Sequence, residues 1–394
     1  MRKKIVKKKH AFFFKLLKPV GKYFSITHNF KYQKFKIKKG QNYLIMSNHQ
    51  TMLDPALMAM SFNRPLYIVA SDHIFNKSLP SQLMQRLLSP IKKKKATADI
   101  SFIVDCVSVA KSGGNVLIYP EGNRAWADFQ FYIDRSIVKL VRMLKLPLML
   151  YNLKGGYGVN PRWGNGLRKG DFKGVINKIY TVEQLKGMTD DELYSEIVNG
   201  LRVIDSESGN SYKSKVRAEY LERELFVCPV CKKESMLVSK GEKVICKNCG
   251  LEVEYTENLK LKSNNKEFSF TKLVDWYKFQ LEYIKAYKIP IDNSVIFADE
   301  NVRFVDKTTE RNKKIGKGSV SLNKDVFILG KKQIDVSSIT SLTAVGGTKL
   351  IVNTKTSSIM IKGHERFNPL KYVLIFNVLR PDLNEKYYGL ELQQ

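Results

Sequence analysis

A histidine and an aspartate stand five residues apart in the run Asn48-His49-Gln50-Thr51-Met52-Leu53-Asp54, directly after a short apolar stretch. On a continuous helix, steps of about 100° would leave the two side chains about 140° apart. If His49 instead lies in a turn and the helix begins after it, the Asp54 carboxylate can reach back to the imidazole. Such a carboxylate fixes the tautomer and stabilises the imidazolium that forms when the ring takes a proton. The pair is a candidate general base.

Asp54 also suits a structural role, because the helix dipole favours an acidic residue in the first turn. A second cluster favours the catalytic interpretation. It is Val116-Leu117-Ile118-Tyr119-Pro120-Glu121-Gly122-Asn123-Arg124, an apolar strand that breaks into a polar loop. Pro120 ends the strand, and Gly122 allows close approach of the backbone. Arg124 is a residue type that binds phosphate well.

Together, the two motifs resemble the PlsC-type glycerolipid acyltransferases, the family of 1-acylglycerol-3-phosphate acyltransferases. The family's N-H-x-x-x-x-D block is matched by Asn48, His49 and Asp54. Its F-P-E-G-T-R block, about 70 residues later, is matched by Pro120, Glu121, Gly122 and Arg124, with Tyr119 for Phe and Asn123 for Thr. The stretch around Pro147 looks like the family's fourth block. The resemblance covers roughly residues 30 to 205.

This resemblance implies an acyl transfer without an acyl-enzyme. His49 would remove a proton from a hydroxyl of a lysophospholipid, and the alkoxide would attack the thioester of acyl-CoA or acyl carrier protein. Asp54 would orient the histidine. The acceptor site would be shaped by Asn48, Glu121, Gly122 and Arg124. The implied acceptor is 1-acylglycerol 3-phosphate, with another lipid, such as a glycolipid or aminolipid, as the alternative.

One block departs from the family pattern. The family's second block carries an arginine that helps bind the acceptor's phosphate, whereas this chain has Pro90-Ile91-Lys92-Lys93-Lys94-Lys95. A lysine of this run would substitute as a point charge, and Lys95 is the candidate. A solvated, purely structural lysine face is the alternative interpretation.

Four of the five cysteines form two C-x-x-C pairs, Cys228 with Cys231 and Cys246 with Cys249, with fourteen residues between the pairs. This spacing resembles a zinc ribbon, in which four thiolates hold a tetrahedral Zn²⁺. No ligand position would remain for water, so the predicted zinc is structural. The fifth cysteine, Cys106, falls in a predicted helix and is expected to pack there.

The elements around the first motifs alternate between strand and helix. Strands are predicted at 42–46, 66–70, 115–119 and 148–153, and helices at 55–60, 99–111 and 136–144. Such alternation predicts a mainly parallel mixed sheet flanked by helices, with functional loops at the strand ends.

The whole chain divides into six predicted parts. Residues 1–40 form a basic amphipathic membrane-surface segment, and 41–205 the acyltransferase domain. A linker helix at 206–226, the zinc ribbon at 227–256 and a connector helix at 257–290 follow. Residues 291–394 form a small antiparallel β-domain capped by a helix at 369–379, with strands predicted at 295–298, 302–305, 326–329, 339–344, 349–352 and 358–361. On pattern alone this last part resembles a PH or GRAM module, and a purely structural β-domain is the alternative.

The charge of the chain points to a polyanionic partner. The net charge is +30, and the first 40 residues hold fourteen Lys or Arg and no acid. An anionic membrane surface, nucleic acid and a solvated tail all fit this charge. A zinc ribbon with positive charge favours nucleic acid, but residues 228–250 lack Arg and carry Glu234 and Glu242. We therefore expect no nucleic-acid partner.

The longest N-terminal apolar run, 11–14, is too short for a signal peptide or for a membrane span of about 20 residues. The predicted location is the cytoplasm, with peripheral binding to the inner face of the membrane.

Overall fold

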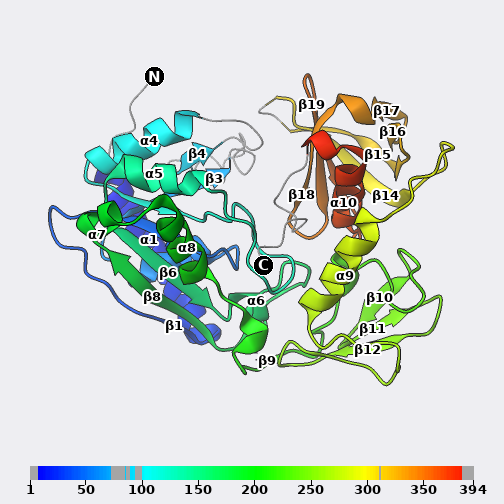
Figure 1. The fold of residues 1–394 in the computed structure, drawn as a ribbon, viewed down its shortest axis with the longest axis horizontal. Coiled ribbons are helices and arrows are strands. Elements are labelled where there is room, and N and C mark those ends of the chain that lie inside the picture. The colour runs from blue at the N-terminus through cyan, green and yellow to red at the C-terminus, as the bar shows by residue number, and fades with distance from the viewer. Residues whose placement is uncertain (1–7, 72–84, 86–88, 94–99, 310–311, 384–394) are drawn as a thin grey trace.

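The apolar runs in the first half of the chain form the strands of one mixed sheet (Figure 1). The computed structural model describes residues 8–71, 85, 89–93, 100–309 and 312–383. Within that part of the chain the sheet has the order β1-β8-β6-β2-β5-β3-β4, and every neighbouring pair except β6 and β8 is parallel. The predicted mainly parallel mixed sheet is confirmed. The strands are β1 (Phe30–Tyr32), β2 (Leu44–Ser47), β3 (Leu66–Ser71), β4 (Ile91–Lys93), β5 (Asn115–Ile118), β6 (Leu148–Lys154) and β8 (Phe172–Tyr180).

Helices cover both faces of this sheet, which is why its central strands are continuously apolar. Leu44 and Met46 of β2 pack in one core cluster with Cys106 of α4. Ile45, which points the other way, packs in a second cluster with residues of α1 and α2. Figure 1 shows α5 and α8 in front of the sheet and α1 behind it. The helices are α1 (Lys8–Thr27), α2 (Asp54–Ser61), α4 (Ile100–Lys111), α5 (Ser136–Leu144), α6 (Gly156–Val159), α7 (Val182–Gly187) and α8 (Asp190–Leu201).

The sheet topology brings the two sequence motifs to one edge. Strands β2, β5 and β6 are parallel neighbours, so their carboxyl ends lie together. The loop 48–53 follows β2, the loop 119–135 follows β5, and the glycine-rich turn at 155 follows β6. In a parallel sheet this edge is where a functional site is expected.

Helix α1 buries one side and exposes the other. His10 and Phe14 are buried, and a Cβ on Gly21 would lie 2.5 Å from the Met60 side chain of α2. The opposite side presents an apolar stripe at spacings of four, three, four and three residues: Phe12, Leu16, Pro19, Tyr23 and Ile26. Among the described residues, no helix combines the length and apolar character that a membrane crossing requires.

The segment between the first sheet and the cysteines corrects one prediction. A linker helix was expected within 206–226, but this stretch holds β9 (Tyr212–Lys213), turns, and short 3₁₀ turns at Asp205–Glu207 and Leu221–Arg223. Strand β9 pairs with β7 (Lys169–Gly170), and the Tyr212 ring fills the space beside Gly158 and Gly170. Contacts with distant residues have overridden the local helix propensity.

The cysteine region and the helix after it come next in the chain. The antiparallel strands β10 (Leu237–Lys240), β11 (Lys243–Cys246), β12 (Glu252–Tyr255) and β13 (Leu261–Lys262) form a small sheet. The connector helix predicted over 257–290 is shorter than expected: only α9 (Leu273–Lys285) is helical, because β13 pairs with β12. Trp276 of α9 donates its indole N–H to the carbonyl of Val227 at 2.9 Å, which ties this helix to the first cysteine pair.

The C-terminal region forms an antiparallel sheet closed by a helix, as predicted. In the described residues its order is β17-β16-β15-β14-β20-β19-β18, and α10 (Pro369–Leu379) packs against β18. The runs at 295–298 and 302–305, expected as separate strands, form one strand with a bulge after Asp299. The strands are β14 (Phe297–Asp306), β15 (Lys313–Leu322), β16 (Val326–Leu329), β17 (Lys332–Asp335), β18 (Ile339–Val345), β19 (Lys349–Thr354) and β20 (Ser358–Lys362).

Candidate functional site

His49 and Asp54 meet, as they can when the helix begins after the histidine. The helix α2 begins at Asp54, so His49 lies in the preceding turn, and its Nδ1 is 2.8 Å from Asp54 Oδ2. The imidazole is partly exposed, whereas the carboxylate is fully buried. No described residue bonds Nε2 of His49. With Nδ1 held by the carboxylate, Nε2 is the nitrogen that can exchange a proton with a bound molecule.

The Asp54 carboxylate organises the turn before the helix rather than capping the helix itself. It accepts N–H bonds from Gln50 at 2.8 Å and Thr51 at 2.9 Å, and the Thr51 hydroxyl at 2.6 Å. The N-cap position of α2 is Leu53, which makes no side-chain cap. Charge-assisted bonds of this kind hold both carboxylate oxygens in place. Thr51 lies inside the sequence motif, but its spacing alone did not reveal this role.

Glu121 joins the two motifs. Its buried carboxyl group accepts the N–H of His49 at 3.4 Å and the N–H of Phe131 at 3.2 Å. The neighbouring Tyr119 ring stacks on the His49 imidazole, with centroids 4.5 Å apart and planes at 23°. The strand end therefore fixes both the backbone and one ring face of His49.

Burial sets the ionisation of Glu121 and predicts a pH effect on stability. Burial raises the pKa of Glu121 to about 8 from 4.5, and Asp54 adds to the rise against the N–H bonds from Phe131 and His49. Between these values the folded protein holds a proton that the unfolded chain has lost, so stability falls as pH rises through this window. In this window, Glu121 alone should lower the free energy of unfolding by about 1.4 kcal/mol for each unit that the pH rises.

Glu121→Gln should therefore flatten the decline in unfolding free energy between about pH 5 and about pH 8, as measured by urea denaturation. Asp205, whose pKa burial raises to about 7, contributes with the same sign and remains in the variant. An equal pH dependence for the wild type and Glu121→Gln would show that Glu121 does not carry this proton.

Arg124 and Asn48 bond mainly to the backbone. Arg124 donates from Nε to the Gln50 carbonyl at 3.1 Å and from Nη2 to Asn160, at 2.8 Å to its carbonyl and 3.0 Å to Oδ1. Asn48 bonds both ways with Leu153 of β6, at 2.9 and 2.8 Å. Asn48 thus holds the end of β2 against β6. The contact of either residue with a substrate remains a prediction.

The remaining predicted acceptor residues lie at different places. Gly122 is exposed, has φ 67° and donates its N–H to the Tyr119 carbonyl at 3.0 Å, which closes the turn after β5. Lys95 lies outside the described residues. Lys92 and Lys93 are exposed on β4, at the edge of the sheet.

The glycine-rich loop after β6 is filled by a carboxylate of this chain. Asp205 accepts the N–H groups of Gly155 at 2.7 Å and Gly158 at 3.1 Å. Asp128 in turn accepts the N–H groups of Asp205 and Ser206 at 2.8 and 2.6 Å. These amides already bond a carboxyl group of this chain, so the loop supports the site edge and is not arranged to receive a phosphate at these positions.

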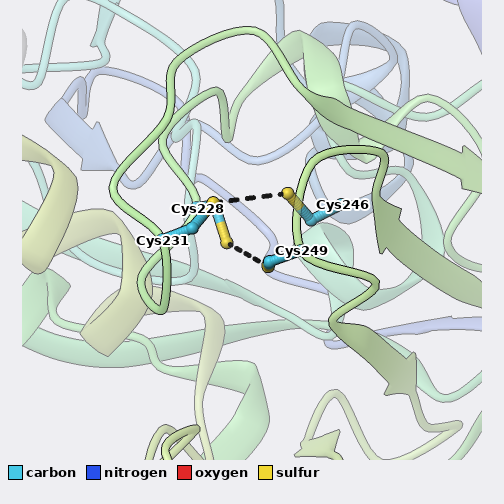
Figure 2. A group of neighbouring side chains, drawn as sticks. All are labelled: Cys228, Cys231, Cys246 and Cys249. Carbon is cyan, nitrogen blue, oxygen red and sulfur yellow. Dashed lines mark hydrogen bonds between the residues drawn. The ribbon is translucent and has the colours of Figure 1, made fainter.

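The four paired cysteines gather as a metal site requires (Figure 2). All their sulfurs lie within 4.8 Å of one another, with 3.7 Å between Cys228 and Cys249 and between Cys231 and Cys246. These separations are too long for disulfides. A tetrahedral Zn²⁺ with bonds of about 2.3 Å places its sulfurs about 3.8 Å apart, which fits the observed spacing.

Comparisons with known proteins single out the segment that carries both motifs. Residues 29–149 match the family model described as Acyltransferase. This acyltransferase-like segment contains His49, Asp54, Glu121 and Arg124, and it ends inside β6. No curated protein matches the chain. Among solved structures, the crystal structure of the 1-acyl-sn-glycerophosphate (LPA) acyltransferase PlsC from Thermotoga maritima aligns with 49% of this chain and 78% of that chain, at 16% identity and a TM-score of 0.42.

Proposed function

We propose that this protein is a peripheral membrane acyltransferase that moves a fatty acyl group from acyl-CoA or acyl carrier protein to a lysophospholipid hydroxyl, with 1-acylglycerol 3-phosphate as the acceptor. The observation that carries the proposal is the 2.8 Å contact between His49 Nδ1 and Asp54, inside the segment that matches the Acyltransferase family. It leaves Nε2 available on a partly exposed imidazole.

The proposed reaction uses His49 first as base and then as acid. Nε2 takes the proton of the acceptor hydroxyl as its oxygen attacks the thioester carbonyl carbon. An ester C–O bond forms, the C–S bond breaks, and the imidazolium returns its proton to the leaving thiolate. The buried Asp54 carboxylate stabilises the imidazolium between these steps. Tyr119 and Glu121 keep the ring in position through the stack and the bond to the His49 N–H.

Arg124 and Lys95 are the proposed contacts for the acceptor's phosphate. The bonds from Nε and Nη2 fix the guanidinium of Arg124. Its Nη1 makes no hydrogen bond to a described residue and can bind a ligand. A fixed guanidinium is well suited to bind phosphate oxygens. Lys95 would add a point charge from the lysine run.

The apolar stripe of α1 supports attachment to a bilayer. Phe12, Leu16 and Ile26 are 62%, 50% and 73% exposed along one side of the helix, and contiguous exposed apolar side chains mark sites of protein or membrane interaction. Exposed Lys15 and Lys22 flank the stripe. Apolar residues beside lysines are the pattern of a helix that lies in the membrane interface.

A row of cations on the C-terminal sheet supports an anionic membrane surface. Strand register places Lys317 opposite Arg303, Arg303 opposite Lys362, and Lys362 opposite Lys349, across β15, β14, β20 and β19. All four side chains are exposed. Like charges directly opposite each other destabilise a sheet, and phosphate headgroups would relieve this repulsion. We propose that the sheet and α10 form a PH-like module that contributes this contact.

Polar substitution of the α1 stripe should weaken vesicle binding. The triple variant Phe12→Gln, Leu16→Gln, Ile26→Gln should lose affinity for vesicles of phosphatidylcholine and phosphatidylglycerol by tenfold or more, on the order of the loss expected from withdrawing these side chains from lipid. Vesicle sedimentation measures the change.

The matched control replaces apolar residues with similar or greater exposure in turns and loops away from α1, by Val216→Gln, Ile291→Gln and Val295→Gln. It should bind vesicles as the wild type does. Equal losses in the two triple variants would contradict a role for α1 in membrane attachment.

We further propose that the four cysteines hold a structural Zn²⁺ in a zinc ribbon. The cluster supplies four sulfurs and no described His, Asp or Glu joins it. Four protein ligands complete a tetrahedral site, so the ion would stabilise the fold without taking part in the chemistry.

A panel of acceptors tests the proposed function. The purified protein would be incubated with labelled acyl-CoA or acyl carrier protein and with lysolipids that carry phosphate, choline, ethanolamine or sugar headgroups. We expect the phosphate acceptor to give the largest kcat/KM. If another lysolipid were preferred, the acyl-transfer chemistry would stand but the phosphate acceptor would be wrong. If no lysolipid were acylated, the proposed function would be rejected.

A further inference from the structure

Arg162 is buried at the point where the loop 121–126, which carries Glu121 and Arg124, meets the C-terminal sheet. Its guanidinium lies over the Trp126 ring at 3.9 Å from the centroid. Nη1 donates to the carbonyl of Arg124 at 3.1 Å. Nη2 donates to the carbonyl of Ala344 at 2.9 Å, near the end of β18, and Nε donates to that of Gly346 at 3.2 Å, in the turn that follows.

These bonds close a ring around Arg124. The Arg124 side chain holds Asn160, and Arg162, two residues further along, holds the Arg124 carbonyl. Both the side chain and the backbone of Arg124 are thereby fixed. The same guanidinium extends the ring to the C-terminal sheet, 182 and 184 residues away in the chain.

The turn after β18 is shaped for this approach. Gly346 has φ 62°, and a Cβ on Gly347 would lie 3.2 Å from the Arg162 carbonyl oxygen. A side chain at Gly347 would require the Arg162 backbone to shift by a few tenths of an ångström. The C-terminal sheet therefore lies against the backbone of the candidate site through a close contact.

We propose that Arg162 is a positioning residue for the proposed acyl transfer, one that aligns the loop 121–126 for the acceptor by clamping it to the C-terminal sheet. It acts through Arg124 and needs no contact with the substrate. This inference rests on the proposed function and predicts that the acceptor's KM depends on an arginine outside both sequence motifs.

Arg223 provides a matched control because it joins the same regions without touching the loop. It donates to the Trp163 carbonyl and Asn165 Oδ1, both at 2.8 Å, and to the Glu365 carbonyl at 2.6 Å. Arg162→Lys and Arg223→Lys each keep the positive charge and lose the planar fork of donors. Burial raises the pKa of Glu224, and the positive charge of Arg162 opposes this rise. Lysine at position 162 keeps that charge.

The experiment compares these two variants in the full-length protein. Arg162→Lys should raise the acceptor KM about tenfold, the size expected from losing charge-assisted bonds, with the KM of the acyl donor unchanged. Hydrogen–deuterium exchange should become faster in peptides covering 121–131. Arg223→Lys should change neither the acceptor KM nor that exchange, although both variants lower thermal stability.

The outcomes separate this inference from the proposed function. Equal effects of the two variants, or normal exchange in Arg162→Lys, would overturn the positioning role. Exchange is measured without turnover, so it decides the alignment of the loop even if the wild type acylates no lysolipid, a result that would reject only the proposed function.

Discussion

His49→Ala should lower the turnover number for acyl transfer about 10²–10⁴-fold, the contribution expected from a positioned general base. Asp54→Ala should also lower turnover, because the imidazolium loses the carboxylate 2.8 Å from Nδ1. Steady-state rates at saturating donor and acceptor measure both effects.

Stability measurements separate chemistry from folding in these variants. His49 is partly exposed, so His49→Ala should unfold near the wild-type midpoint. Asp54 accepts the buried N–H groups of Gln50 and Thr51, so Asp54→Ala should cost about 1–3 kcal/mol of stability. His364→Ala, at an exposed histidine on the C-terminal side, is the control and should keep full activity. Wild-type turnover in His49→Ala would remove the assigned base.

Removal of zinc should unfold the cysteine region. The purified protein should contain one Zn²⁺ per chain, and a strong chelator should melt residues 228–262, since zinc binding in such small units is worth about 10–16 kcal/mol. The indole of Trp276 bonds the Val227 carbonyl beside Cys228, so tryptophan fluorescence should shift as zinc leaves. Metal analysis and fluorescence during chelation measure the two events together.

Single cysteine variants provide the control for this experiment. Cys231→Ser should lose zinc, whereas Cys106→Ser should retain it, because Cys106 packs inside the core beside the first sheet. A metal-free preparation with an ordered 228–249 segment would contradict the zinc site.

The local pairing of the site followed from the sequence because its geometry is short-range. His49 and Asp54 can meet only if the helix starts after the histidine, and α2 begins at Asp54. The two C-x-x-C pairs likewise constrain their own cluster. Short, continuous apolar runs between predicted helices indicated the parallel strands, since a strand buried on both faces requires continuous apolar sequence.

Long-range contacts explain what the sequence could not show. The stretch 206–226 has helical character, yet β9 pairs with β7 and Tyr212 fills the space left by two glycines. Strand β15 escaped prediction because its exposed lysines and glycines do not alternate with apolar residues. The partners of Arg124 and Arg162 come from loops far away in the chain, and no spacing rule links them.

The most direct test is the formation of phosphatidic acid from 1-acylglycerol 3-phosphate and an acyl thioester, followed by mass spectrometry in the wild type and in His49→Ala. The account predicts that product accumulates with time in the wild type and forms about 10²–10⁴-fold more slowly in the variant. Product formed equally by both proteins, or by neither, would contradict it.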